Sequence, residues 1–296
     1  MIALLACLAG CSGDDSSGSS EPGTIALDFQ PNAVHAGIYA SGLKIRVPAA
    51  STDSLKLLAA HRADMSVVDI HDLGLAREAG SDVVGVGALV QRPLAAVIAR
   101  RGDVRRPRDL EGRRVGVTGL PSDEAVLRAV VEHDGGDYDR VKKVTIGFSA
   151  VPSLIAGRVD AVVSFWNAEG VALRERGIDT REFRVDDYGA PRYPELVLVV
   201  NRQTLEEHER LVDDMLGAIA EGTERALRNR DETVQTLVRA SGADEPLVRA
   251  QLKAVAPALE PPVQLNQAAL EGWARFDERF GILRRTPDVS EAFFVR

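Results

Sequence analysis

The stretches LLAAHRADMSV (residues 57–67) and LIAGRVDAVV (residues 154–163) share one pattern. In each, a segment with helical spacing of apolar residues ends at a short basic turn. An aspartate, Asp64 or Asp160, then precedes a continuous apolar run. Runs of this kind after a turn are typical of strands buried in a parallel sheet. One copy in each half of the chain therefore predicts an α/β protein in which the same small unit occurs twice.

The rest of the chain follows the same alternation of strands and helices as far as residue 201. The segments expected to be strands are Thr24–Phe29, Leu43–Val47, Met65–Val68, Val83–Leu89, Ala95–Arg100, Arg114–Val117, Lys143–Ile146, Ala161–Phe165 and Leu196–Asn201. Helix-start residues such as Pro121-Ser122-Asp123 lie between them. From Thr204 onward the strand pattern stops, and LEEHERLVDDMLGAIAEGTERALRNR (205–230) predicts a long amphipathic helix followed by shorter ones. The fold class is α/β with short crossovers and a helical C-terminal tail.

Composition excludes several classes of function. The 296 residues are 45% hydrophobic and 27% charged, which is typical of a globular protein and not of a disordered chain or a multi-span membrane protein. The 44 acidic and 36 basic residues are spread along the chain and give a formal net charge of −8. Because no basic stripe is present, we expect no nucleic-acid partner.

The N-terminal stretch IALLACLAGCSGDDSSGSSEPG (2–23) resembles a bacterial lipoprotein signal. Residues 1–11 would form the signal, ending at Cys11 as the lipidated residue, and residues 12–23 a flexible linker. The protein would then be lipid-anchored to the outer face of the cell membrane. An ordinary cleaved signal peptide is the alternative. The apolar run is shorter than the roughly 20 residues that span a bilayer, and the only cysteines are Cys7 and Cys11, so we expect no cysteine metal site.

The stretch LDFQPNAVHAGIYA (27–40) joins a predicted strand to a predicted helix and carries five candidate ligand-binding residues. They are Asp28, Phe29, Asn32, His35 and Tyr39. Ligands of doubly wound sheets bind beyond the carboxyl ends of the strands, where loops lead into helices. The alternatives are that Asn32 only caps the helix, Phe29 belongs to the core and His35 is a half-buried, satisfied imidazole. Since the next strand begins soon after Tyr39, the helix is expected to have about two turns.

A second candidate motif, WNAEG (166–170), follows another buried strand. Trp166 offers an aromatic face, while Asn167 and Glu169 offer polar groups. An aromatic face can stack on a flat ring, and a carboxylate can accept amino protons. The alternative interpretation packs Trp166 under the cleft and leaves Glu169 in the first turn of a helix.

Four further residues are candidates for ligand contact. Asp69 follows the strand Met65–Val68, Ser122 and Asp123 lie in a loop that begins a helix, and Tyr188 precedes the last predicted strand. For the loop, capping alone is the alternative. The five histidines occur singly, and the sequence has no Gly-x-Ser-x-Gly elbow. We therefore expect no metal, no cofactor and no catalytic residue.

These motifs resemble those of type II periplasmic binding proteins. Together with GALVQRPLAAVIA (87–99), DLEGRRVGVTGLPSDEAVL (109–127) and GFSAVPSLIAGRVDAVV (147–163), they resemble the thiamine-precursor-binding proteins in particular. The resemblance implies two α/β lobes joined by two crossing strands, with the ligand in the cleft between them. Lobe 1 would comprise residues 24–95 and 203–296, and lobe 2 residues 96–202 with the hinge crossings at its ends.

The same resemblance implies a function. The chain would be a monomeric solute-binding component of an ABC importer that delivers a pyrimidine to the permease and ATPase subunits. Riboflavin or a sulfonate-type solute is the alternative ligand. An enzyme that makes the pyrimidine with pyridoxal phosphate is a further alternative, but it needs a lysine in the cleft. The five lysines, Lys44, Lys56, Lys142, Lys143 and Lys253, all lie away from the motif loops.

Overall fold

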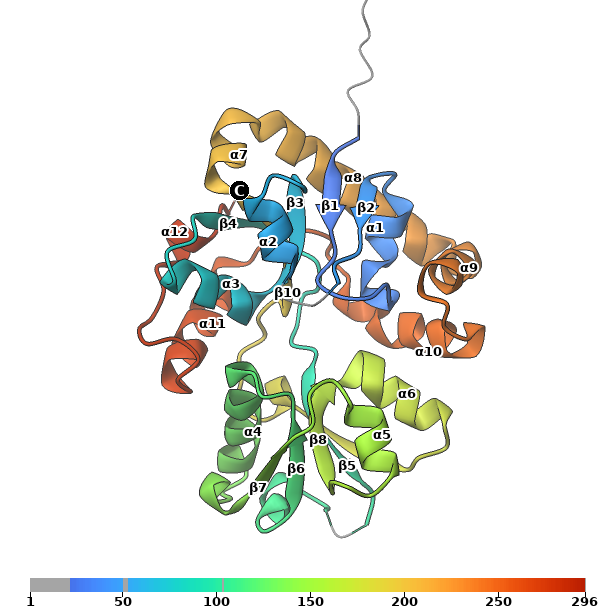
Figure 1. Ribbon diagram of the computed structural model, residues 1–296, viewed down its shortest axis with the longest axis vertical. Helices are drawn as coiled ribbons and strands as arrows, with labels where there is room; N and C mark the ends of the chain where they lie inside the picture. Colours follow the sequence, from blue (N-terminus) through green and yellow to red (C-terminus); the bar gives the residue numbers. More distant parts are fainter. Residues whose placement is uncertain (1–21, 50–52, 103, 296) are drawn as a thin grey trace, which may run out of the picture.

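A computed structural model describes residues 22–49, 53–102 and 104–295. The predicted signal with Cys11, and residues 12–21 of the predicted linker, lie outside the described residues. Each described strand belongs to one of two five-stranded sheets, which lie in separate lobes (Figure 1). No helix of the described part is both long enough and apolar enough to cross a membrane.

The first sheet has the strand order β2-β1-β3-β10-β4. Its strands are β1 (Thr24–Ala26), β2 (Lys44–Arg46), β3 (Met65–Asp69), β4 (Val83–Ala88) and β10 (Leu196–Asn201). β1, β2 and β3 are parallel, while β10 runs antiparallel to β3 and β4. This sheet and the helices around it form the first lobe.

The second sheet has the order β7-β6-β8-β5-β9. Its strands are β5 (Ala95–Arg100), β6 (Arg114–Val117), β7 (Lys142–Thr145), β8 (Ala161–Phe165) and β9 (Thr180–Arg184). Here β5 is antiparallel to both neighbours. In each sheet, therefore, one strand runs antiparallel to its two neighbours. The second sheet and the helices around it form the second lobe.

Helices surround both sheets. The first lobe begins with η1 (Ala33–His35), α1 (Ala36–Ala40), α2 (Asp53–Ala59) and α3 (Ile70–Glu78). The second lobe holds η2 (Pro107–Leu110), α4 (Pro121–His133), η3 (Tyr138–Arg140), α5 (Ala150–Ile155), the π-helical turn η4 (Trp166–Gly170), α6 (Val171–Glu175) and η5 (Val185–Asp187). The C-terminal tail consists of α7 (Arg202–Glu207), α8 (Glu209–Arg228), α9 (Arg230–Ser241), α10 (Glu245–Val255), η6 (Ala256–Ala258), α11 (Gln267–Arg279) and α12 (Val289–Ala292).

The predicted strands all have counterparts, but two features differ from the prediction. The sequence analysis missed β9, because TREFR (180–184) has a single apolar residue, Phe183, and forms the edge of a sheet. It also assigned Leu196–Asn201 to the second lobe, whereas β10 pairs with β3 and β4 in the first. The second crossing between the lobes therefore precedes β10, at residues 188–195, and the first is Leu89–Leu94.

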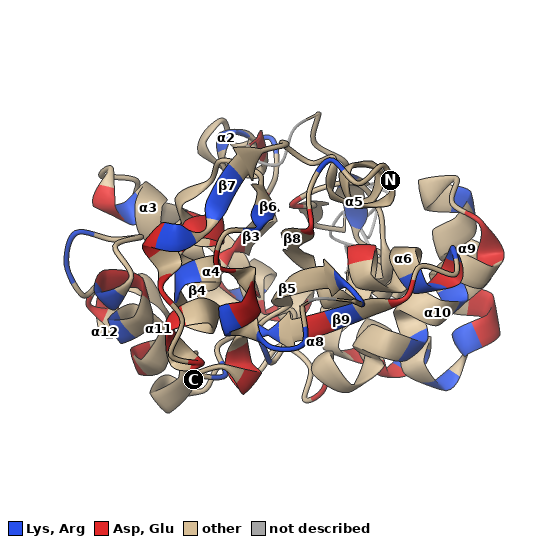
Figure 2. Cartoon of the chain, turned by 90° about the horizontal axis from the view of Figure 1, so that it is seen from below, with Lys and Arg blue, Asp and Glu red and all other residues tan. Residues whose placement is uncertain are grey.

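The tail does not belong to one lobe alone. α10 contacts η1 of the first lobe and also α6 and η4 of the second. Gln251 on α10 lies with its Nε2 3.5 Å from the carbonyl oxygen of Ala168 in η4. Seen from below, acidic and basic segments are mixed over the chain (Figure 2), in keeping with the absence of a basic stripe from the sequence. A helix of the tail thus touches both motifs that the sequence analysis selected.

The first helical segment of the chain is short, as predicted, and it packs closely on α8. η1 and α1 together span Ala33–Ala40. A Cβ atom added at Gly222 of α8 would overlap the carbonyl oxygen of Gly37, and one added at Gly37 would overlap Thr223. Two glycines therefore allow the backbones to approach, and this contact anchors a segment of only two turns.

We expect Gly222→Ala to lower the free energy of unfolding by about 1–3 kcal/mol, because the new methyl group meets backbone that must shift. Chemical denaturation followed by circular dichroism measures the change. Gly217→Ala in the same helix is the matched control, since a Cβ there meets nothing within 4 Å. This control should gain about 1 kcal/mol from helix propensity. Equal stabilisation by both substitutions would show that the close approach is not required.

Candidate functional site

A cavity of about 510 Å³ lies between the lobes, a volume within the usual range for small-molecule sites. The first lobe contributes the loop after β1, part of α2, and the junction of β3 with α3. The second lobe contributes the loops after β6, β7 and β8. Glu195 and Leu196, at the end of the second crossing, complete its wall. The carboxyl ends of strands from both sheets thus face one space.

Four residues of the first motif form a hydrogen-bonded unit at this wall. Asn32 caps η1, with its Oδ1 accepting from Val34 N at 3.0 Å. The backbone N–H of Asn32 donates to Nδ1 of His35 at 3.2 Å. Nε2 of His35 must then carry the ring proton, and it donates to Oδ1 of Asp28 at 2.6 Å. His35 is fully buried and does not line the cavity. It positions Asp28, which with Phe29 and Asn32 does line it.

The second lobe presents two half-buried carboxyl groups. Glu169, in the turn η4, accepts the backbone N–H of Phe165 at 3.1 Å, and its burial raises its pKa. Asp123 accepts from both the N–H and the hydroxyl of Thr118, and burial likewise raises its pKa. Ser122 lies beside it in the wall. Asp69, also a predicted site residue, reaches the same cavity from the first lobe.

Five predicted site residues lie elsewhere. The structure places His35, Tyr39, Trp166, Asn167 and Tyr188 outside the lining of the cavity. Tyr39 packs half-buried against the core of the first lobe, and Tyr188 makes edge contacts with the rings of His133 and Phe183. Asn167 is 2% exposed.

Trp166 is the largest departure from the prediction. Its ring is 2% exposed, and its Nε1–H donates to the carbonyl oxygen of Pro93 at 3.0 Å. The guanidinium of Arg184 lies 4.0 Å from the ring centroid, at a distance typical of a cation–π contact. The indole therefore packs against the first crossing, and an aromatic face for a ligand must come from another residue.

Phe148 supplies such a face, and the sequence analysis did not name it. It lies between β7 and α5, is 67% exposed, and lines the cavity from the second lobe. Its ring stacks on Phe29 of the first lobe with centroids 5.7 Å apart and planes at 28°. The signal that could have found it is an aromatic residue in the turn Gly147-Phe148-Ser149, where nothing local would bury it. The two rings bring both lobes into contact at the cavity.

The ionisable side chains of the wall all have one sign. Among the residues that the structure describes, the lining includes six carboxyl groups and no lysine, arginine or histidine. They are Asp28, Asp69, Asp72, Asp123, Glu169 and Glu195. Asp72 and Glu195 were not predicted. An anionic ligand would be repelled here, whereas a ligand that donates hydrogen bonds or carries positive charge finds acceptors.

Behind the wall, at the hinge end, lies a buried network around His71. Its Nδ1 is 2.7 Å from Oδ1 of Asp277, and its Nε2 is 3.2 Å from the hydroxyl of Tyr193. Burial alone would lower the pKa of His71, but the charge and hydrogen bond of Asp277 raise it to about 10. One ligand-type atom from each of Asp69, His71 and Glu195 lies within 4.8 Å of the others. Both ring nitrogens of His71 already have hydrogen-bond partners, so we interpret this cluster as an ion-pair network.

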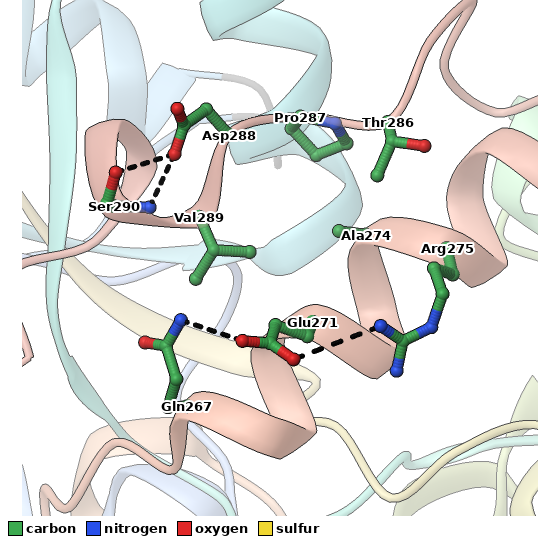
Figure 3. A pocket seen from close by; sticks show the side chains of 9 residues that line it. All are labelled: Gln267, Glu271, Ala274, Arg275, Thr286, Pro287, Asp288, Val289 and Ser290. Carbon is green, nitrogen blue, oxygen red and sulfur yellow. Dashed lines mark hydrogen bonds and ion pairs between the residues drawn. The ribbon is translucent and has the colours of Figure 1, made fainter.

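A second hollow, of about 380 Å³, lies on the first lobe between α11 and the start of α12 (Figure 3). Glu271 there accepts from Gln267 at 3.1 Å and pairs with Arg275 at 3.9 Å. Its polar side chains are exposed and pair with one another, and only one lobe contributes to it. We therefore take the interlobe cavity as the functional site.

Comparison with known proteins finds relatives of this chain. The sequence profile of the family described as "NMT1/THI5 like" matches residues 35–233. The formylaminopyrimidine-binding protein of Halalkalibacterium halodurans is 33% identical over 251 residues, which cover 80% of this chain and 76% of the relative. A protein of Haemophilus influenzae named for thiamine biosynthesis is 26% identical over 287 residues, 90% of each chain.

Solved structures show the same fold. The periplasmic aliphatic sulphonate-binding protein of Escherichia coli superposes with a TM-score of 0.76 over 93% of this chain and 92% of its own, at 17% identity. The alkanesulfonate-binding protein of Xanthomonas axonopodis gives 0.72 over 94% and 100%, at 19% identity. These likenesses confirm the predicted periplasmic-binding-protein fold with two α/β lobes.

Proposed function

This chain belongs to the NMT1/THI5-like family, and on that premise we propose that it is the solute-binding component of an ABC importer that captures a thiamine-precursor pyrimidine. One observation carries the proposal. The interlobe cavity combines two stacked phenyl rings with carboxyl groups and, among the described residues, no basic side chain. The 33% identical relative is named for binding formylaminopyrimidine, which has the matching chemistry.

The ring and the amino group of such a ligand each find a partner. Stacking on Phe29 or Phe148 is worth about 0.5–1.5 kcal/mol beyond burial of the area. Glu169 is held in place by the N–H of Phe165, and its carboxylate can accept an amino proton, which is worth about 1.5–3 kcal/mol. Because the two phenyl rings come from different lobes and stack on each other, a ligand ring that inserted between them would contact both lobes at once.

The charge of the cavity argues against the sulfonate alternative. A sulfonate needs arginine side chains or several free N–H groups, and the six carboxyl groups of the wall would repel it. The resemblance to sulfonate-binding proteins is at 17–19% identity and therefore concerns the fold alone. We propose a ligand that is neutral or cationic.

We further propose that no bond is made or broken in the cleft. An enzyme of this fold that used pyridoxal phosphate would need a lysine to hold it, and the lining of the cavity has none among the described residues. The ligand would be released to permease and ATPase subunits. We also propose that a lipid at Cys11 anchors the protein to the outer face of the cell membrane, and that the chain is a monomer.

A thermal-shift panel tests the ligand class. The panel comprises formylaminomethyl-, aminomethyl- and hydroxymethyl-pyrimidine, thiamine, riboflavin and taurine. At 100 times Kd a ligand adds about 2.7 kcal/mol to the free energy of unfolding. This corresponds to a rise in Tm of about 5–10 °C for a chain of this size. We expect at least one pyrimidine to give that rise and taurine to give none. A response to riboflavin with silence from every pyrimidine would overturn the proposal.

A further inference from the structure

The first crossing changes its attachment from one lobe to the other between two adjacent residues. The N–H of Gln91 donates to the carbonyl of Ala258 at 2.7 Å, and its side chain donates to the carbonyls of Pro261 and Gln264. These partners belong to the tail of the first lobe. The next residue, Arg92, pairs instead with Asp186 of the second lobe at 2.7 Å. The boundary between the lobes therefore falls at Gln91–Arg92.

The second crossing changes its attachment in the same way. Arg192 lies 3.7 Å from the buried carboxylate of Asp186, in the second lobe. Its neighbour Tyr193 bonds to His71 of the first lobe at 3.2 Å. Pro191 already lies against Gly272 of α11 in the first lobe, so here the change of attachment falls between Asp186 and Tyr193. Both crossings run between the lobes in Figure 1, and a rotation of one lobe against the other is expected at these two places.

The side chain of Glu195 reaches back across this boundary. Its main chain belongs to the first lobe, where its carbonyl accepts the N–H of Ile70 at 2.9 Å. Its Oε2 accepts the N–H of Leu94 at 2.8 Å and that of Ala95 at 3.4 Å. Both amides follow Arg92 and so move with the second lobe. Glu195 is 2% exposed and also lines the cavity.

We propose that Glu195 is a positioning residue that ties the wall of the cleft to the relative orientation of the two lobes. One carboxylate oxygen holds the start of β5 across the hinge, and the same carboxyl group faces the space where a ligand lies. A ligand N–H that reaches this carboxylate acts directly on the hinge. The position of the lobes thus depends on what occupies the cleft. Only the identity of that ligand rests on the proposed function.

Amide hydrogen exchange of the full chain without ligand tests this role. Glu195→Asp keeps the carboxylate near His71 but shortens the side chain, so that it no longer extends to the amides of Leu94 and Ala95. Glu195→Gln keeps the side-chain length but removes the charge. We expect the amides of Leu94 and Ala95 to exchange at least tenfold faster in Glu195→Asp and about fivefold faster in Glu195→Gln. Exchange within β5, at Val97 and Ile98, should stay as in the wild type.

The matched control is Asp72→Asn. It removes another carboxylate of the same cavity, one for which the structure gives no hydrogen bond to either crossing. Small-angle X-ray scattering of the same samples should show a broader distribution of lobe separations in Glu195→Asp and not in Asp72→Asn. Unchanged exchange at Leu94 and Ala95 in Glu195→Asp, or equal loss of protection in Asp72→Asn, would overturn the proposal. If no pyrimidine raises the Tm of the wild type, the proposed function fails, while the exchange result still decides the role of Glu195.

Discussion

Replacing His71 with glutamine is expected to lower the free energy of unfolding by about 3–5 kcal/mol at pH 6, the largest effect on stability that we predict for a single residue. The imidazolium is fully buried and lies 2.7 Å from Asp277, which is also buried. Removing one partner of a buried ion pair leaves the other charge without compensation. Urea denaturation at pH 6 measures the loss.

The same pair gives a pH dependence of defined sign. The folded pKa of His71, about 10, lies above the unfolded value of roughly 6.5, so the folded state binds the extra proton. The stabilisation is complete below about pH 6.5 and is lost as the pH rises toward 10. Burial also raises the pKa of the nearby carboxyl groups of Asp69 and Glu195. Their ionisation therefore likewise lowers the stability of the folded state as the pH rises. Denaturation curves from pH 6 to 9.5 should show falling stability, with a smaller slope in His71→Gln.

The double variant His71→Gln, Asp277→Asn is the control. It removes both charges, so it should recover a large part of the stability lost in the single variant. If the double variant is as unstable as the sum of the single variants, the two residues do not act as a pair. The prediction would then be wrong even if His71→Gln itself were unstable.

Replacing Glu169 with glutamine is expected to weaken binding of the pyrimidine identified by the panel by about 10- to 100-fold, the largest effect on affinity that we predict. Loss of a charged hydrogen bond costs about 1.5–3 kcal/mol, and each 1.4 kcal/mol is tenfold in Kd. Isothermal titration calorimetry measures the change. Because burial raises the pKa of Glu169, affinity in the wild type should also fall on acidification, as the carboxylate becomes protonated.

Glu175→Gln is the matched control, since it makes the same change on the exposed surface of α6. It should bind as the wild type does. Wild-type affinity in Glu169→Gln would mean that another carboxyl group accepts the amino protons. In that case Asp123, the other half-buried carboxyl that the second lobe contributes to the cavity, becomes the residue to substitute.

Much of the cleft could be predicted from the sequence because its residues occupy a defined place in an α/β unit. Four predicted residues of the first lobe lie at the end of a buried strand or shortly after it, and the structure places all of them on the wall of the cavity. They are Asp28, Phe29, Asn32 and Asp69. Ser122, Asp123 and Glu169 follow the same rule in the second lobe. The end of a parallel strand is a position that local sequence can identify, and side chains there share one edge of the sheet.

The sequence by itself determined the alternation of strands and helices and the loops that follow the strands, since these follow from the spacing of neighbouring residues, while the resemblance of its motifs to a known family implied the two α/β lobes. Only the tertiary structure decided which aromatic ring faces a ligand, which sheet receives β10 and which carboxylate crosses the hinge. Trp166 is buried because Pro93, 73 residues away, accepts its N–H. Phe148 is 67% exposed, and its ring stacks on Phe29 of the other lobe. Distant segments of the chain create these environments, so the periodicity of neighbouring residues cannot predict them.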